Sequence, residues 1–369
     1  MSECIEHPEN SPEYEGLKVN KGIPQPEAMN PNIAARLKMI KKRTLSVNDY
    51  VEGILKGDIN ILSQAITLVE SAKPEHQAIA QEVIRQCLPS SGQSVRIGIT
   101  GVPGAGKSTF IESFGKYLTG EGHKIAVLAI DPSSERSKGS ILGDKTRMEE
   151  LSRDPHAYIR PSPSAGSLGG VARKTREAMI LCETAGYDII LIETVGVGQS
   201  ETAVHSMVDF FLLMQIAGAG DELQGIKRGI MEMADCIIIN KADGNNIQRA
   251  ELAKAQLQMA LHYFPPHESG VEPKVMTCSA YERTGIDEIW KNILHYCSET
   301  QQNGYFESRR AEQAKYWMYE TINEQLRNHF YQSQKENLKK AEAEVTENRA
   351  SSFAAAFELL DKYFKGTEK

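Results

Sequence analysis

The sequence lacks the features of several large protein classes. No apolar run is long enough to span a bilayer, and the first residues lack the basic and then apolar pattern of a signal peptide. Basic residues are not in excess, since the chain has 42 lysines and arginines but 49 aspartates and glutamates, for a net charge of -7. A general nucleic-acid binder is normally basic. We therefore expect a cytoplasmic protein that binds neither membranes nor nucleic acid.

Cysteine and histidine are present but scattered. The six cysteines form no C-x-x-C pair, and the nine histidines show no metal-ligand spacing. In a chain of 369 residues such cysteines are expected to be reduced and buried, rather than joined in disulfides or bound to zinc. The composition, 40% hydrophobic and 25% charged, is that of a soluble globular protein with room for one large domain and appendages.

Composition and periodicity divide the chain into four segments. Residues 1–32 contain five prolines among polar and acidic residues, which predicts a disordered tail. Residues 33–92 place apolar residues at helical spacing and predict an N-terminal helical segment. Residues 93–300 alternate short apolar runs with helical patterns, which predicts an α/β domain with a mostly parallel sheet flanked by helices. The six apolar runs are 95–99, 124–130, 187–193, 210–216, 236–240 and 274–278.

Residues 301–369 change in character. Two apolar stripes at helical spacing flank the charged stretch 335–349, which predicts amphipathic helices outside the sheet domain. The stripes pack either against the same subunit or against a second one. The sequence alone does not decide between these two arrangements.

The most informative stretch is GVPGAGKST at 101–109, which matches the phosphate-binding pattern G-x-x-x-x-G-K-[ST] between a β-type run and a helical one. Glycines let the backbone wrap a phosphate, and the N–H groups at the start of the helix face the anion. We expect Lys107 to reach the β- and γ-phosphates and Ser108 to ligate Mg²⁺. The predicted phosphate-binding residues are Gly101, Val102, Pro103, Gly104, Ala105, Gly106, Lys107, Ser108 and Thr109.

A second motif indicates which base the nucleotide carries. Asn240, Lys241 and Asp243 form N-K-x-D at the end of an apolar run. The carboxylate accepts hydrogen bonds from guanine N1–H and its exocyclic amine, whereas adenine would leave buried polar groups unpaired. The weaker pattern Ser279, Ala280 and Tyr281 follows the next run and is typical of a loop that packs on guanine.

Acidic residues at the ends of other runs are candidates for the metal side of the site. Glu193 ends an apolar run and begins E-T-V-G in the place of the usual D-x-x-G, so that the Gly196 N–H could sense the γ-phosphate. Asp131 ends another run, where it either faces the metal or caps a turn. Asp144 lies in a polar, glycine-containing segment, either as a switch residue or as one loop acid among several.

These segments together resemble the MeaB/ArgK family of P-loop GTPases, which are relatives of the human methylmalonic aciduria type A protein. The resemblance covers roughly residues 45–330. Beyond the two nucleotide motifs it is carried by AIDPSSERSKGSILGDKTRM, ETVGVGQSE, GDELQGIKRGI and NKADGNN.

The resemblance implies a homodimeric, Mg²⁺-dependent GTPase whose C-terminal helices form the dimer. It implies a partner, an adenosylcobalamin-dependent acyl-CoA mutase and usually methylmalonyl-CoA mutase, whose cofactor loading the GTPase gates and which it protects or reactivates. Residues 220–230 would be an additional switch loop, with Asp221 and Lys227 acting beside Lys107 in catalysis and in coupling to the partner. The implied Mg²⁺ residues are Ser108, Asp131, Asp144 and Glu193.

Further expectations concern the rate of GTP hydrolysis and two alternative functions. Val197 stands where Ras-like proteins have their water-orienting glutamine, so we expect slow intrinsic hydrolysis that a partner accelerates. An ATP-using accessory of lysine, arginine and ornithine transport, the role attached to the ArgK name, is disfavoured by the guanine motif. A metal-insertion GTPase is disfavoured because the sequence has no His-rich tract or paired cysteines.

Overall fold

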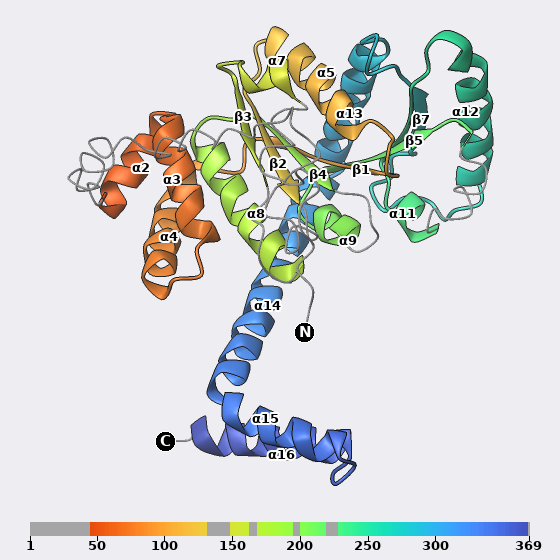
Figure 1. Ribbon diagram of the computed structural model, residues 1–369. Helices are drawn as coiled ribbons and strands as arrows, with labels where there is room; N and C mark the ends of the chain where they lie inside the picture. Colours follow the sequence, from red (N-terminus) through yellow and green to blue (C-terminus); the bar gives the residue numbers. More distant parts are fainter. Residues whose placement is uncertain (1–44, 131–147, 162–167, 195–199, 219–227, 368–369) are drawn as a thin grey trace, which may run out of the picture. The chain divides into compact units, whose positions relative to one another are not determined.

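The computed structural model describes residues 45–130, 148–161, 168–194, 200–218 and 228–367. Its centre is a seven-stranded sheet of order β3-β2-β4-β1-β5-β6-β7, in which all described strand pairs are parallel (Figure 1). This confirms the predicted α/β class. The strands are β1 Val95–Gly101, β2 Ile125–Ile130, β3 Ala157–Arg160, β4 Ile189–Thr194, β5 Phe210–Ile216, β6 Cys236–Asn240 and β7 Lys274–Thr277.

The strand order places β1 at the point where the chain changes direction across the sheet. β1 pairs with β4 on one side and β5 on the other, so that Ile97 lies beside both Leu191 and Phe210. In open parallel sheets, ligands bind beyond the carboxyl ends of the strands at such a point. The loop 101–108 leaves β1 at this place, which is where a nucleotide site is expected.

Helices cover both faces of the sheet (Figure 1). On one face, α5 (Lys107–Gly120), α7 (Glu149–Ser152) and α13 (Ile286–Gln302) share a core with β1, β2, β4, β5 and β6. On the other face, α11 (Arg228–Glu232) and α12 (Ile247–Leu261) share a second core with β5, β6 and β7. The same face carries α8 (Leu168–Thr184) and α9 (Ser200–His205), which lie against β2, β4 and β1. Burial on both faces explains the continuous apolar runs in the sequence.

The described part of the N-terminal segment is helical, as the periodicity predicts. It contains α2 (Val47–Leu55), α3 (Ile59–Glu70), α4 (Pro74–Cys87) and a short 3-10 turn, η2 (Leu88–Ser90). Ser46 caps α2, and the Asp58 carboxylate caps α3 by accepting from the amides of Asn60 and Ile61. Arg160 of β3 forms an ion pair with Glu70, which fastens the end of α3 to the edge of the sheet. The predicted tail 1–32 lies outside the described residues.

Three helices follow α13. They are α14 (Tyr305–Ser333), α15 (Lys335–Thr346) and α16 (Ser352–Thr367). The helical prediction for this region is therefore confirmed, and the segment boundaries stay a prediction. None of the helices in the described ranges combines the length and hydropathy of a bilayer-spanning segment. The five described cysteines are buried and unpaired.

Candidate functional site

The loop between β1 and α5 has the backbone that phosphate binding requires. Gly106 lies in the left-handed region at φ 85° and is the N-cap of α5, so the helix begins at Lys107 with its first N–H groups turned toward the loop. Gly101 has φ 150°, and a Cβ there would overlap the carbonyl oxygen of Met214 on β5. Only glycine fits between the two strands at this point. Ala105 is buried, while Pro103 and Gly104 are exposed at the rim.

Lys107 is almost fully buried, with 9% of its surface exposed. Its ammonium donates to the carbonyl oxygens of Gly101, at 2.8 Å, and Val102, at 3.3 Å. Burial lowers the pKa of Lys107, and the negative charges of Glu193 and Glu201 oppose this effect only in part. The site thus holds a desolvated cation directly below the glycine loop, where an anion would be strongly attracted.

Ser108 and Glu193 meet at the same edge of the sheet. The Ser108 hydroxyl donates to Oε1 of Glu193 at 3.1 Å, although 85 residues separate them in the chain. Beneath them the Thr194 hydroxyl donates to the Thr100 hydroxyl at 2.8 Å, which ties the end of β4 to the end of β1. Two side-chain oxygens are therefore held side by side, and hard oxygen donors are the ligands that Mg²⁺ prefers.

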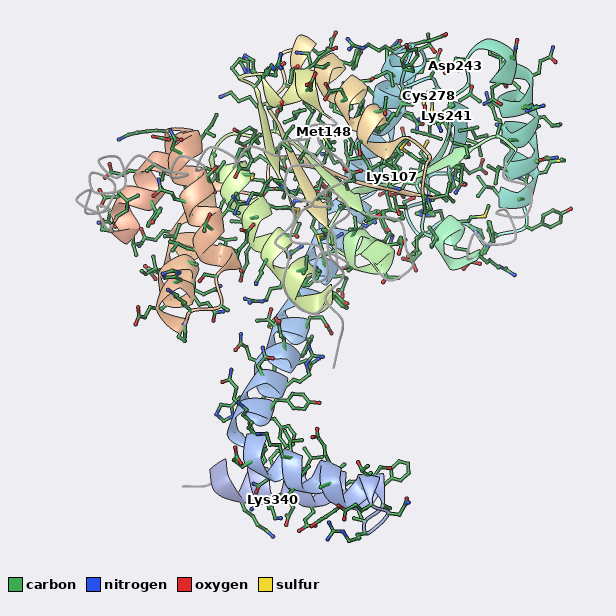
Figure 2. All side chains as sticks on the ribbon, in the orientation of Figure 1. Lys107, Met148, Lys241, Asp243, Cys278 and Lys340 are labelled. Atoms are coloured by element: carbon green, nitrogen blue, oxygen red, sulfur yellow. The ribbon has the colours of Figure 1, made fainter. Side chains whose placement is uncertain are left out.

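The guanine motif is built from the ends of β6 and β7. Figure 2 labels Lys241, Asp243 and Cys278 in this region, and also Lys107 at the start of α5. The Ser279 hydroxyl donates to Oδ2 of Asp243 at 2.5 Å and accepts from the Glu282 amide at 3.0 Å. These two bonds fix the carboxylate in one orientation. A fixed acceptor pair of this kind matches the two donors on the Watson–Crick edge of guanine.

Asn240 joins the base loops to the phosphate loop. Its side chain is 2% exposed, donates to the Ala105 carbonyl at 2.8 Å and accepts from the Ala280 amide at 3.0 Å. The exposed Lys241 has φ 61°, and the Asn246 side chain bonds its carbonyl at 2.6 Å. Asn240 therefore sets the spacing between the loops that would hold the base and the phosphates.

The structure gathers the described residues of both sequence motifs at one edge of the sheet. Tyr281, 87% exposed, lies beyond Ala280 at the rim. Of the predicted site residues, five lie outside the described ranges: Asp131, Asp144, Gly196, Asp221 and Lys227.

Sequence reasoning missed Glu201, whose charge acts on Lys107 and which is 3% exposed on α9. The sequence offers only a weak signal for it, a carboxylate eight residues after Glu193 at the end of the stretch ETVGVGQSE. It also missed the pairing of Thr100 with Thr194, because these hydroxyls are 94 residues apart and belong to no motif.

Three comparisons with known proteins place the chain in a family. The family model described as "Methylmalonyl Co-A mutase-associated GTPase MeaB" matches residues 62–335. The chain is 48% identical over 293 residues to "GTPase ArgK" of Escherichia coli (strain K12), covering 79% of this chain and 88% of the relative. It is 47% identical over 331 residues to "Methylmalonic aciduria type A homolog, mitochondrial" of Mus musculus, covering 86% of this chain and 80% of the relative.

A solved structure described as a LAO/AO transport system kinase superposes on the chain with a TM-score of 0.68 and 38% sequence identity. The match covers 86% of this chain and 97% of the other. The arrangement of strands around the phosphate loop is thus shared with a solved relative of nearly the same extent.

Proposed function

Since the chain belongs to the family of methylmalonyl Co-A mutase-associated GTPases, MeaB, we propose that it binds and hydrolyses GTP as a chaperone of a cobalamin-dependent acyl-CoA mutase. One observation carries the nucleotide part of the proposal. The Asp243 carboxylate, oriented by Ser279, is joined through Asn240 to the loop that begins α5. A guanine acceptor and a phosphate cradle are then parts of a single hydrogen-bonded unit.

Binding of GTP changes the partners of Lys107. Its ammonium leaves the carbonyl oxygens of Gly101 and Val102 and pairs with the β- and γ-phosphates, where the charge that burial disfavours is neutralised. The N–H groups at the start of α5 donate to the same phosphates. Both groups are in place before the reaction, so they stabilise the charge that grows as water attacks the γ-phosphorus in line.

The oxygen pair at this edge fits a Mg²⁺ ion. Ser108 and Glu193 would hold it, and Asp131 and Asp144 are proposed to complete the set from outside the described ranges. Such an ion supplies charge neutralisation of the β- and γ-phosphate oxygens. The chain's own contribution would be to fix these two residues: the Thr100–Thr194 bond holds the end of β4, where Glu193 is the last residue but one.

Turnover is proposed to be slow without a partner. Val197, Lys227 and Asp221 lie outside the described residues, and the proposed roles of the last two, to add charge and to couple the site to the partner, rest on the resemblance. Arg228, the neighbouring cation, pairs with Glu232 at 2.9 Å and lies 5.4 Å above the ring of Phe264. Both contacts lie at the surface, and Arg228 would exchange them for a phosphate contact if it took such a role.

The mutase part of the proposal rests on the relatives. The family description names methylmalonyl-CoA mutase, and the mouse relative is a methylmalonic aciduria type A homolog. We propose that the nucleotide state gates adenosylcobalamin loading and the protection or reactivation of this enzyme, and that the chain acts as a cytoplasmic homodimer. The described part of the chain offers no cluster of three or more His, Cys, Asp or Glu side chains that would suit a metal cargo.

The test combines purified protein with purified methylmalonyl-CoA mutase. We expect the two to co-elute on size-exclusion chromatography with a non-hydrolysable GTP analogue, and we expect the mutase to raise kcat for GTP hydrolysis. Lys107→Ala, which removes the phosphate-binding cation, serves as the matched control and should abolish both effects. Hydrolysis that the mutase leaves unchanged, with no co-elution in any nucleotide state, would contradict the partnership.

A second function is favoured by the description of one solved relative as a transport system kinase. A kinase of that kind would use ATP, whose base has an acceptor, N1, and a C–H group at the two positions where the Asp243 carboxylate requires donors. Competition of ATP and GTP for one labelled nucleotide separates the two functions. We expect GTP to displace it at concentrations at least about a hundredfold lower, because the wrong base leaves buried polar groups unpaired.

A further inference from the structure

The first half of α14 forms hydrogen bonds with residues 206–209, the short link between α9 and β5. The Trp317 indole N–H donates to the Ser206 carbonyl at 3.0 Å, and the Gln313 amide donates to the Val208 carbonyl at 2.8 Å. Arg310, one turn earlier, holds both carboxylate oxygens of Asp209 at 2.7 Å. The three side chains stand at positions i, i+3 and i+7, which lie on one face of a helix.

These contacts are buried and therefore costly to lose. Trp317 is 7% exposed and Gln313 is 5% exposed, while Asp209 is 3% exposed and also accepts from the Arg96 amide of β1 at 2.9 Å. The link thus has polar contacts with α14 at three of its four residues. A surface helix that only covered an apolar patch would not need directed hydrogen bonds of this kind.

On its other side, α9 lies directly against β1. A Cβ added at Gly98 would come within 2.7 Å of the Val204 side chain and 3.1 Å of Val208. Gly98 lies three residues before the glycine loop, so α9 packs on the strand that delivers the loop. α9 begins four residues after the last glycine of E-T-V-G and carries Glu201, whose charge acts on Lys107. One short helix is thus placed between the nucleotide site and α14.

We propose that Trp317 and Gln313 are positioning residues for GTP hydrolysis, which hold α9 against β1 and transmit its position to α14. The inference rests on the GTP hydrolysis proposed above. Ser206 directly follows the six-residue helix α9, so a change at the γ-phosphate that shifts α9 as a unit would also alter the Trp317–Ser206 bond. Loosening this bond leaves α9 less fixed and lowers the rate of the chemical step rather than nucleotide affinity.

The two tryptophans of the chain allow a direct test. Trp290 lies in the core beside Phe114, so Trp290→Phe leaves Trp317 as the sole indole. We expect its emission to differ between the GDP·Mg²⁺ and the non-hydrolysable GTP analogue·Mg²⁺ complexes, with bound nucleotide counted separately by chromatography. Identical emission in two fully loaded complexes overturns the inference and leaves GTP binding intact. If Trp290→Phe fails to fold, the difference between wild type and Trp317→Phe gives the same signal.

Kinetics provide the second readout. Trp317→Phe keeps a ring in place and removes the donor to Ser206, so we expect kcat to fall about three- to tenfold with KM unchanged. Gln313→Met removes the other donor and should act in the same direction. Glu324→Gln is the matched control, because Glu324 joins α14 to Arg173 of α8 at 2.9 Å and does not touch α9. A kcat within twofold of wild type in both donor variants, or an equal fall in the control, overturns the proposal.

Discussion

At the scale of single residues, Lys107 carries a conflict between function and stability. Burial lowers its pKa, so the folded protein disfavours the charged form that the phosphates require. A lysine whose folded pKa lies below the unfolded value destabilises the fold in full at pH below the folded pKa, and this cost is lost as pH rises from the folded pKa to the unfolded one. At any pH below the folded pKa the nucleotide-free protein therefore bears this cost in full.

Lys107→Met tests that conflict. We expect the variant to lose GTP affinity on the order of a hundredfold or more, because a phosphate contact inside a desolvated site is removed. We expect its free energy of unfolding without nucleotide to equal or exceed that of wild type, because no ammonium is buried. Equilibrium binding and urea denaturation measure the two quantities. A nucleotide-free variant that is clearly less stable than wild type would show that the bonds to Gly101 and Val102 outweigh the burial of charge.

Asp243→Asn separates base recognition from phosphate binding. The amide presents a donor where the carboxylate presents only acceptors, so guanine meets a mismatch and xanthine, with a carbonyl in place of the amine, meets a match. We expect the affinity of the variant for GTP to fall about a hundredfold. We expect its affinity for xanthosine triphosphate to rise until it exceeds its affinity for GTP. The Ser279 hydroxyl can still donate to the remaining amide oxygen, which keeps the loop in place. Competition binding with both nucleotides decides, and equal loss of both would mean that the loop has collapsed.

The residues of the two nucleotide motifs could be predicted because their chemistry is local in sequence. Glycines at 101 and 106 meet backbone constraints that fix the residue type, and the acid at 243 lies where its motif places the proposed guanine acceptor. Glu201 and Trp317 could not be predicted in this way. Their roles depend on which distant segments the fold brings together, and a buried glutamate or indole has no spacing of its own.

At the scale of elements, the packing of α9 on β1 depends on the absence of a side chain. Gly98→Ala inserts a methyl group between Val204 and Phe211, with contacts of 2.7 and 2.9 Å that the neighbours must relieve. We expect a loss of about 1–3 kcal/mol in the free energy of unfolding, as for other overpacked cores. Gly120→Ala, at the exposed end of α5 with open space around it, is the control and should gain about 0.5–1 kcal/mol. Urea denaturation of the pair would contradict this account if both variants lost stability alike.

The elements themselves were predictable to different degrees. All six apolar runs form strands, because strands buried on both faces leave continuous apolar stretches. β3 was missed because only one of its four residues, Tyr158, is buried, so its sequence lacks an apolar run. β4 begins two residues later and ends one residue later than the run 187–193, since the hydrogen-bonded ladder and not hydropathy sets its limits.

At the scale of the whole molecule, charged residues rather than apolar ones join the elements at the amino ends of the central strands. Arg96 of β1 pairs with Glu183 of α8 at 2.7 Å, and Arg310 of α14 pairs with Asp209 before β5. Burial alone would raise the pKa of Glu183, but the bonds and charge of Arg96 hold it below its ordinary value. This contribution to stability is present above the unfolded pKa of the carboxyl and is lost as pH falls through the folded one.

The last helix presents two unlike faces, and this leads to a prediction about assembly. Ala355 and Leu359 of α16 are buried, whereas Phe353 and Phe357 on another face are 79% and 73% exposed. Covering large apolar side chains of this kind contributes about 1.5–3 kcal/mol each, enough for a stable pair of chains when several are buried together. We expect a dimer in light scattering, and we expect Phe357→Glu to shift it to monomer. Lys362→Glu places the same charge on the same helix away from this face and should leave the dimer intact. A wild-type monomer, or a dimer that survives Phe357→Glu, would mean that the exposed face with Phe353 and Phe357 does not form the dimer and binds another partner.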